Sequence, residues 1–229
     1  MSMKSPGNLP RVLLACLLAA GANGCAKGTS AAGGAALAQS PPPTQPPGVV
    51  SPSEQIANLK QLAEEAPKMD AGQRNRITAE LIRRIQREED AVLRSEMLRT
   101  LAACGGPAAD AVLRSALRDP DADIRVLACG FCGKSGDAQA VQCLAAVLSA
   151  DIDKDVRMAA ARALGSAHDP KAIAVLGTAL DDKDPAMQYC AVVALRKLTG
   201  RDLGNDVDRW RVALKSGALR LAARPHSWF

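Results

Sequence analysis

Apolar residues recur between residues 90 and 200 with the spacing of a helix face, and the whole arrangement repeats at a nearly constant interval. The pattern starts at four anchor positions, Leu93, Ile124, Val156 and Met187. Apolar or small residues stand four and eight positions after each anchor, which places them on one side of a helix. A second stripe follows the first three anchors at a constant distance and starts at Leu113, Leu144 and Leu176. Each unit therefore predicts a helix, a short turn and a second, antiparallel helix.

Turn-forming residues divide the two predicted helices of each unit, as in Gly105-Gly106-Pro107 and His168-Asp169-Pro170. Aspartates stand at each unit boundary, where a carboxylate can cap the first helix. The distance between successive anchors lies in the range of repeat lengths that is typical of solenoids. Aromatic residues make up only 2% of the chain, which disfavours β-sandwiches and barrels. We therefore expect an all-α chain.

The stretch DVRMAAARALG, residues 155–165, resembles a HEAT repeat of the short bacterial type, also called PBS-lyase HEAT-like. The resemblance covers about residues 90–200 and implies a right-handed α-solenoid of antiparallel helix pairs (HEAT-like repeats). It also implies a ladder in which boundary aspartates pair with the arginine that follows each anchor. By this match the ladder residues are Asp121, Asp153 and Asp184 with Arg94, Arg125 and Arg157. Gln188 replaces the arginine in the last unit, so we expect the ladder to end there.

The repeated region has atypical ends, as expected for terminal repeats. Residues 53–89 hold two amphipathic helices, and Trp210 lies in a C-terminal helix where we expect it to plug the end of the stack. We therefore assign the solenoid to residues 53–216 and a basic C-terminal tail to residues 217–229. The tail could contact an anionic surface, or it could be a solvated end of the chain.

The first 52 residues have a different composition and predict export. Within residues 1–24, Lys4 and Arg11 precede an apolar run from Val12 to Ala22, the layout of a signal peptide. The end of this segment resembles a bacterial lipobox, which implies lipidation of Cys25, although Ala22 stands where leucine is usual. Leu13-Leu14-Ala15-Cys16 fits the lipobox consensus better, but too few apolar residues would precede its cleavage site, which favours Cys25. Residues 25–52 then form a Gly-, Ala- and Pro-rich linker. We expect a lipid-anchored protein at the cell envelope, on the periplasmic or extracellular face; ordinary secretory cleavage is the alternative.

Cys129 and Cys132 form the C-x-x-C motif that could serve redox chemistry, haem attachment or zinc. Their register in the repeat instead aligns them with small and apolar positions of the other units, which favours packing. A disulfide among Cys104, Cys129, Cys132 and Cys143 and a metal site stay as alternatives.

The sequence contains no familiar catalytic or nucleotide-binding motif and only two histidines. We expect no cofactor, no metal, no nucleic-acid partner and no enzymatic activity. Stacked pairs create a concave face lined by the second helices, and Arg114, Gln142 and Thr178 are its candidate binding residues. The sequence thus favours an envelope scaffold that binds an unidentified protein. The alternative is a lyase-like or cofactor-handling accessory protein, as the resemblance to PBS-lyase HEAT-like proteins implies.

Overall fold

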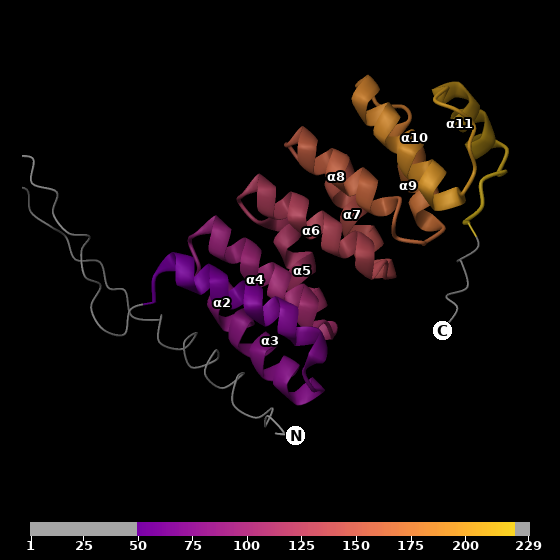
Figure 1. Ribbon diagram of the computed structural model, residues 1–229. Helices are drawn as coiled ribbons and strands as arrows, with labels where there is room; N and C mark the ends of the chain where they lie inside the picture. Colours follow the sequence, from indigo (N-terminus) through magenta and orange to yellow (C-terminus); the bar gives the residue numbers. More distant parts are fainter. Residues whose placement is uncertain (1–49, 223–229) are drawn as a thin grey trace, which may run out of the picture.

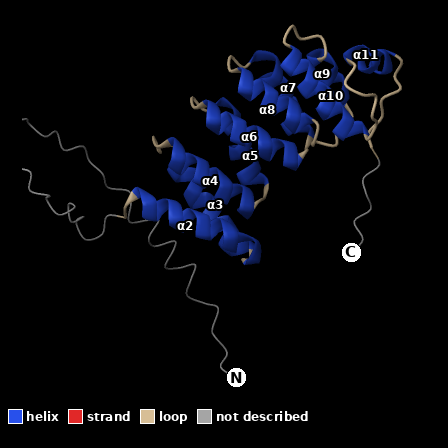
Figure 2. Ribbon diagram, turned by 45° about the horizontal axis from the view of Figure 1, so that its top comes forward, coloured by secondary structure: helices blue, strands red, loops and turns tan. Residues whose placement is uncertain are grey.

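The computed structural model describes residues 50–222. The assigned signal peptide, the lipidation site Cys25 and most of the linker lie outside the described residues, as does the end of the basic tail. Within residues 50–222 the secondary structure is entirely helical (Figure 2). The helices are α2 (Pro52–Glu65), α3 (Ala71–Ile85), α4 (Ala91–Cys104), α5 (Pro107–Ser115), α6 (Ala122–Ser135), α7 (Ala138–Ala150), α8 (Lys154–Leu164), α9 (Lys171–Ala179), α10 (Pro185–Thr199) and α11 (Val207–Lys215). Two short 3-10 helices, η1 (Ala66–Lys68) and η2 (Ala116–Arg118), extend α2 and α5.

The helices stack as consecutive pairs in two layers, which confirms the predicted all-α solenoid (Figure 1). The first helices of the pairs, α2, α4, α6, α8 and α10, pack side by side in chain order. The second helices, α3, α5, α7 and α9, form the other layer, and α11 packs against both α9 and α10 at the C-terminal end. None of the described helices is long and apolar enough to cross a membrane.

Boundary aspartates determine where the first helices begin. The carboxylate of Asp121 accepts hydrogen bonds from the amides of Asp123 and Ile124, and Asp153 does the same for Asp155 and Val156. Asp90 caps α4 in the same way, and Asp184 caps α10 by accepting the amide of Ala186. Each cap contributes about 1 kcal/mol by satisfying amides that have no partner inside the helix. The predicted capping role of these aspartates is confirmed.

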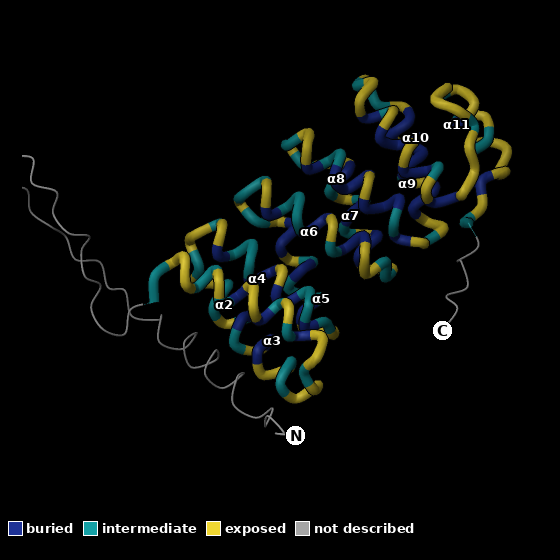
Figure 3. Tube along the Cα trace, viewed as in Figure 1, coloured by how far each residue is buried: buried dark blue, intermediate teal, exposed yellow. Residues whose placement is uncertain are grey.

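The core runs continuously between the two layers (Figure 3). All four anchors of the first stripe are buried, and so are the leucines of the second stripe, Leu113, Leu144 and Leu176. The repeat interval therefore marks positions that meet the same neighbours in successive pairs.

Two glycines allow the first helices to approach very closely. A Cβ atom placed on Gly133 of α6 would lie 2.8 Å from the carbonyl oxygen of Ala163 in α8. One placed on Gly165, just after α8, would lie 2.8 Å from the Cα of Ala194 in α10. Since these contacts are with backbone atoms, only a residue without a side chain fits without displacing a neighbouring helix.

Trp210 fills the C-terminal end of the core, as the sequence predicts. Its ring is completely buried, and its Nε1 donates a 2.9 Å hydrogen bond to the carbonyl oxygen of Gly204. The chain then folds back, because Leu219 is buried and the amide of Ala222 donates to the carbonyl of Leu198 in α10. The first residues of the segment assigned to the tail therefore pack against the solenoid.

Candidate functional site

Arginines connect successive unit boundaries along the stack. Arg94 donates from Nε and Nη2 to the two carboxylate oxygens of Asp119, at 3.1 and 2.9 Å. Its Nη1 donates to the carbonyl oxygens of Glu88 and Glu89, which precede its own helix. One planar guanidinium thus joins two loops that lie a full unit apart in sequence.

Arg125 repeats this arrangement in the next unit. It donates to both oxygens of Asp151, at 2.8 and 3.0 Å, and to the carbonyl oxygens of Asp119 and Pro120. Both side chains of this ion pair are largely buried. Bidentate pairs of this kind have a defined geometry as well as a favourable charge interaction.

Of the three arginines assigned to the ladder, Arg94 and Arg125 bind boundary carboxylates, but the acids assigned to them were wrong. Asp119 and Asp151 accept the arginines, whereas Asp121 and Asp153 stand two residues later and cap α6 and α8. The physical difference is one of position: Asp119 and Asp151 lie two residues before the N-caps, where both carboxylate oxygens meet the guanidinium of the preceding unit. The Oδ1 atoms of Asp121 and Asp153 instead accept the first amides of α6 and α8.

The ladder changes at the unit that begins with α8. Arg157 donates to the carbonyl oxygens of Asp151 and Ile152, but within residues 50–222 its guanidinium makes no hydrogen bond to a carboxylate. Asp184, its assigned partner, is instead paired with Lys154 at 2.5 Å. Gln188 keeps only the backbone contact, since its Nε2 donates to the carbonyl of Asp182. The carboxylate half of the ladder therefore ends at Asp151.

Asp151 is ionised more easily than an ordinary aspartate. Burial by itself would raise its pKa, but hydrogen bonds from Arg125 and from the amide of Asp153 outweigh burial and lower the pKa. The Arg125–Asp151 pair therefore remains charged well into the acidic range.

Cys129 and Cys132 are packing residues in this structure. Both are buried within α6, and burial raises the pKa of each thiol to about 12. The cysteines of the described region are free thiols: Cys104, Cys129, Cys132, Cys143 and Cys190. The same region brings together no group of three or more His, Cys, Asp or Glu side chains that could hold a metal ion. At neutral pH the thiols of Cys129 and Cys132 have almost no thiolate, the form that attacks disulfides and binds metals.

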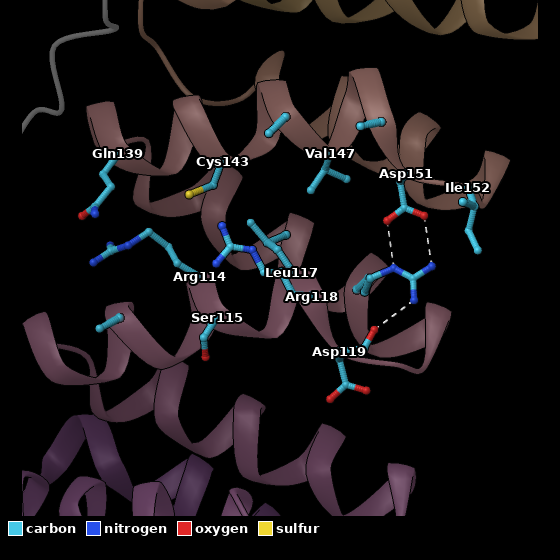
Figure 4. Close-up of a pocket in the computed structure, with 14 residues that line it drawn as sticks. Arg114, Ser115, Leu117, Arg118, Asp119, Gln139, Cys143, Val147, Asp151 and Ile152 are labelled. Carbon is cyan, nitrogen blue, oxygen red and sulfur yellow. Dashed lines mark hydrogen bonds and ion pairs between the residues drawn. The ribbon is translucent and has the colours of Figure 1, made fainter.

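A groove of about 670 Å³ lies between α5–η2 and α7 (Figure 4). We call it the α5–α7 groove. Its lining is Ala111, Arg114, Ser115, Leu117, Arg118, Asp119, Arg125, Gln139, Cys143, Ala146, Val147, Ala150, Asp151 and Ile152. A volume of this size lies within the roughly 300–1,000 Å³ typical of ligand sites.

Of the three binding residues expected from the sequence, only Arg114 lines this groove. Gln142 is exposed on α7 outside the groove lining. Thr178 is exposed on α9, and its hydroxyl donates to the carbonyl of Val175 in its own helix. The repeat register correctly placed these residues on the second helices, but it did not show that the groove lies between α5 and α7.

Ion pairs hold both ends of the α5–α7 groove: one joins its two walls, and the other joins the end of α7 to α6. Arg114 on α5 pairs at 3.3 Å with Asp137, the N-cap of α7. At the other end, Arg125 holds Asp151, the residue that follows α7 (Figure 4). The groove is therefore formed before anything binds in it.

Two groove residues of interest were missed by the sequence reasoning. Arg118 is exposed, and it has no acidic partner among the residues that the structure describes. Ile152 is 94% exposed in the loop after α7. A signal for Ile152 was available, because the matching boundary positions hold Pro120 and Lys183, which suit a solvated loop better.

Comparisons with known proteins agree with this architecture. The family model described as HEAT repeats matches residues 78–165 and 144–207, which together are more than half of the chain. Human deoxyhypusine hydroxylase in complex with glycerol is similar at 25% identity and a TM-score of 0.50, over 54% of this chain and 44% of that chain. An engineered protein is similar at 22% identity and a TM-score of 0.46, over 72% of this chain and 92% of its own.

This chain spans less than half of the hydroxylase, so the likeness concerns stacked helix pairs and not that whole protein. No curated protein matches the sequence. The repeated anchors, the two helical layers and the match over residues 78–207 lead to one conclusion: the chain belongs to the HEAT-repeat family.

Proposed function

We propose that this HEAT-repeat protein is a scaffold that binds a protein partner in the α5–α7 groove. The observation that supports this proposal is a preformed groove that combines apolar side chains with exposed arginine. The centres of protein interfaces are enriched in apolar residues and arginine. Because the Arg114–Asp137 ion pair already joins the two walls, a partner does not have to bring them together when it binds.

Site-specific photocrosslinking in cells tests this scaffold function. A benzophenone amino acid replaces Ser115, which is exposed inside the groove, or Gly130, which is exposed on α6 with open space around it. We expect the same crosslinked protein in replicate experiments with the probe at Ser115 and not at Gly130. Identical products from both positions, or none from Ser115, would contradict binding in the groove.

We further propose that Cys25 carries a lipid and that residues 25–52 tether the solenoid to the envelope. The support is the sequence: a basic start, an apolar run, and a cysteine preceded by small residues. Cys25→Ser is expected to abolish incorporation of labelled palmitate, while Cys16→Ser, which changes the other cysteine of the leader, leaves labelling intact. Unchanged labelling of Cys25→Ser would disprove the anchor.

The likeness to human deoxyhypusine hydroxylase supports a second candidate, an enzymatic or cofactor-handling role. An absorption spectrum of the purified native protein separates the two candidates. A visible band would favour cofactor handling, and a colourless protein that retains the groove crosslink favours the scaffold.

A further inference from the structure

We infer that the α5–α7 groove receives an acidic, amphipathic segment of its partner, with a carboxylate at Arg118 and an aliphatic side chain at Val147 and Ile152. This inference rests on the proposed scaffold function and specifies the chemistry of the partner. It depends on which charges of the groove are already neutralised and on where its apolar surface is exposed.

The acidic side chains of the groove are already fully used. Both carboxylate oxygens of Asp119 accept from Arg94, and both oxygens of Asp151 accept from Arg125. One oxygen of each also accepts a backbone amide, from Asp121 and Asp153. These carboxylates therefore have little remaining capacity to attract a cation, and they do not define the groove as a site for a basic partner.

The cations of the groove are less fully compensated. Arg125 is balanced by Asp151, and Arg114 has a single contact of 3.3 Å with Asp137. Arg118, on the same wall as Arg114, has no acidic partner among residues 50–222. The groove thus has an uncompensated positive charge, for which an Asp or Glu side chain is the complementary group.

Apolar surface lies on the opposite wall and at its end. Val147 of α7 is half-buried in the wall, and Ile152 follows that helix with almost its whole side chain in water. Burying an isoleucine side chain favours binding by roughly tenfold or more. A partner residue that covers Ile152 would remove the most exposed large apolar side chain of the described region from water.

The charge and the apolar surface lie on opposite walls of one groove, so the occupant has to present both kinds of group (Figure 4). A peptide segment with an acidic residue near an aliphatic one does this, whereas an inorganic anion supplies only the charge. An acidic amphipathic peptide is therefore the occupant that fits both observations.

Selection from a phage-displayed library of random dodecapeptides tests the inference. The target is the full chain, purified in detergent, as wild type and as Arg118→Glu and Ile152→Ser. The matched controls are Arg76→Glu, an exposed arginine on α3, and Val92→Ser, an exposed aliphatic residue on α4. We expect wild type and both controls to select peptides in which Asp or Glu lies near Leu, Ile, Val or Met, and Arg118→Glu to lose that acidic preference.

The best peptide, labelled with fluorescein, then gives affinities by fluorescence anisotropy. Arg118→Ser is expected to weaken binding about fivefold, the effect of one exposed ion pair. Ile152→Ser is expected to weaken it roughly tenfold, and Arg76→Glu should leave it unchanged. Raising the salt concentration should weaken wild type more than Arg118→Ser.

The outcomes separate this inference from the scaffold function. If the selected peptides lack acidic residues but bind Ile152→Ser more weakly than wild type, the claim of an acidic partner is overturned, while the groove remains a binding site. If the same peptides are selected by wild type and by both groove variants, or if no peptide is selected, the inference is overturned and the result counts against the groove as a binding site. Displacement of the peptide by phosphatidylglycerol vesicles, but not by phosphatidylcholine vesicles, would identify a lipid surface as the occupant and overturn the peptide.

Discussion

Single atoms determine how closely the helices of the first layer stack. Gly133 faces backbone atoms of Ala163, whereas Gly130, one turn earlier in α6, has nothing within 4 Å. Gly133→Ala is therefore expected to lower the free energy of unfolding by about 1–3 kcal/mol through overpacking. Gly130→Ala should raise it by about 0.5–1 kcal/mol, because alanine favours the helix.

Urea unfolding followed by circular dichroism measures both alanine variants. The pair is well matched because it makes the same change in the same helix. Equal effects at the two positions would show that helix propensity, and not the contact with α8, determines the result.

Buried thiols make stability depend on alkaline pH. The pKa of Cys132 is about 12 in the folded chain, above the ordinary value near 9, so the thiol is more acidic once the chain unfolds. The buried thiol makes its full contribution to the free energy of unfolding below pH 9, and this contribution is lost as the pH rises towards 12. Between pH 8 and pH 10 the loss is on the order of 1 kcal/mol for each such thiol.

Cys132→Ala tests this dependence, with Cys143→Ala as the control because Cys143 is only partly buried. Unfolding free energy measured at pH 8 and pH 10 should fall less in Cys132→Ala than in wild type and in Cys143→Ala. The same fall in all three proteins would mean that the buried thiol does not cause it.

At the scale of elements, the arginine ladder fixes one helix pair to the next. Arg125→Ala would leave the largely buried Asp151 without its bidentate partner and is expected to cost about 2 kcal/mol. Arg157→Ala should cost less, because within the described chain Arg157 bonds only to backbone carbonyls. Thermal unfolding of the two variants at pH 7 gives the comparison, and equal losses would contradict a role for the carboxylate.

The Arg125–Asp151 contact also depends on pH, but it weakens towards acid, whereas the buried thiols destabilise the fold towards alkali. Because the folded chain lowers the pKa of Asp151, its contribution is present at neutral pH and is lost as the pH falls through the acidic range. The difference in stability between wild type and Arg125→Ala should therefore shrink below about pH 4.

The terminal helix α11 is held by one large side chain. Trp210→Ala removes a fully buried ring and its hydrogen bond to Gly204, and we expect a loss of about 3–5 kcal/mol at this end. Since repeats contact only their neighbours, hydrogen exchange should speed up in α10 and α11 while α4 stays protected. Uniform loss of protection would instead indicate a single cooperative unit.

The sequence predicted elements well because their determinants are local. The anchor spacing, the turn residues and the capping aspartates all lie within one unit. The predicted turn at His168 is also present, and this residue has a positive φ of 48° there. The ladder acids were missed because Asp119 and Asp121 are equally regular in sequence. Only the three-dimensional direction of each carboxylate distinguishes the cap from the bridge.

At the scale of the whole molecule, periodicity predicts a stack but not its irregularities. The α5–α7 groove depends on how far two second helices separate, and side chains from different units decide this distance. Arg118 and Ile152 could not be chosen as groove residues from the repeat alone, because the repeat treats every pair of neighbouring second helices as equivalent. The candidate site, the α5–α7 groove, therefore lies where the structure departs from the regular repeat.

The location of the groove divides the stack into two parts. Behind it, α4 packs against α6 with Ala102 at the position that glycine holds in the next two units. Contact along one edge and a groove along the other divide the stack here into α2–α5 and α6–α11. The Arg114–Asp137 ion pair ties these two parts together across the groove, so the same contact that shapes the groove also sets how the two halves of the solenoid are oriented.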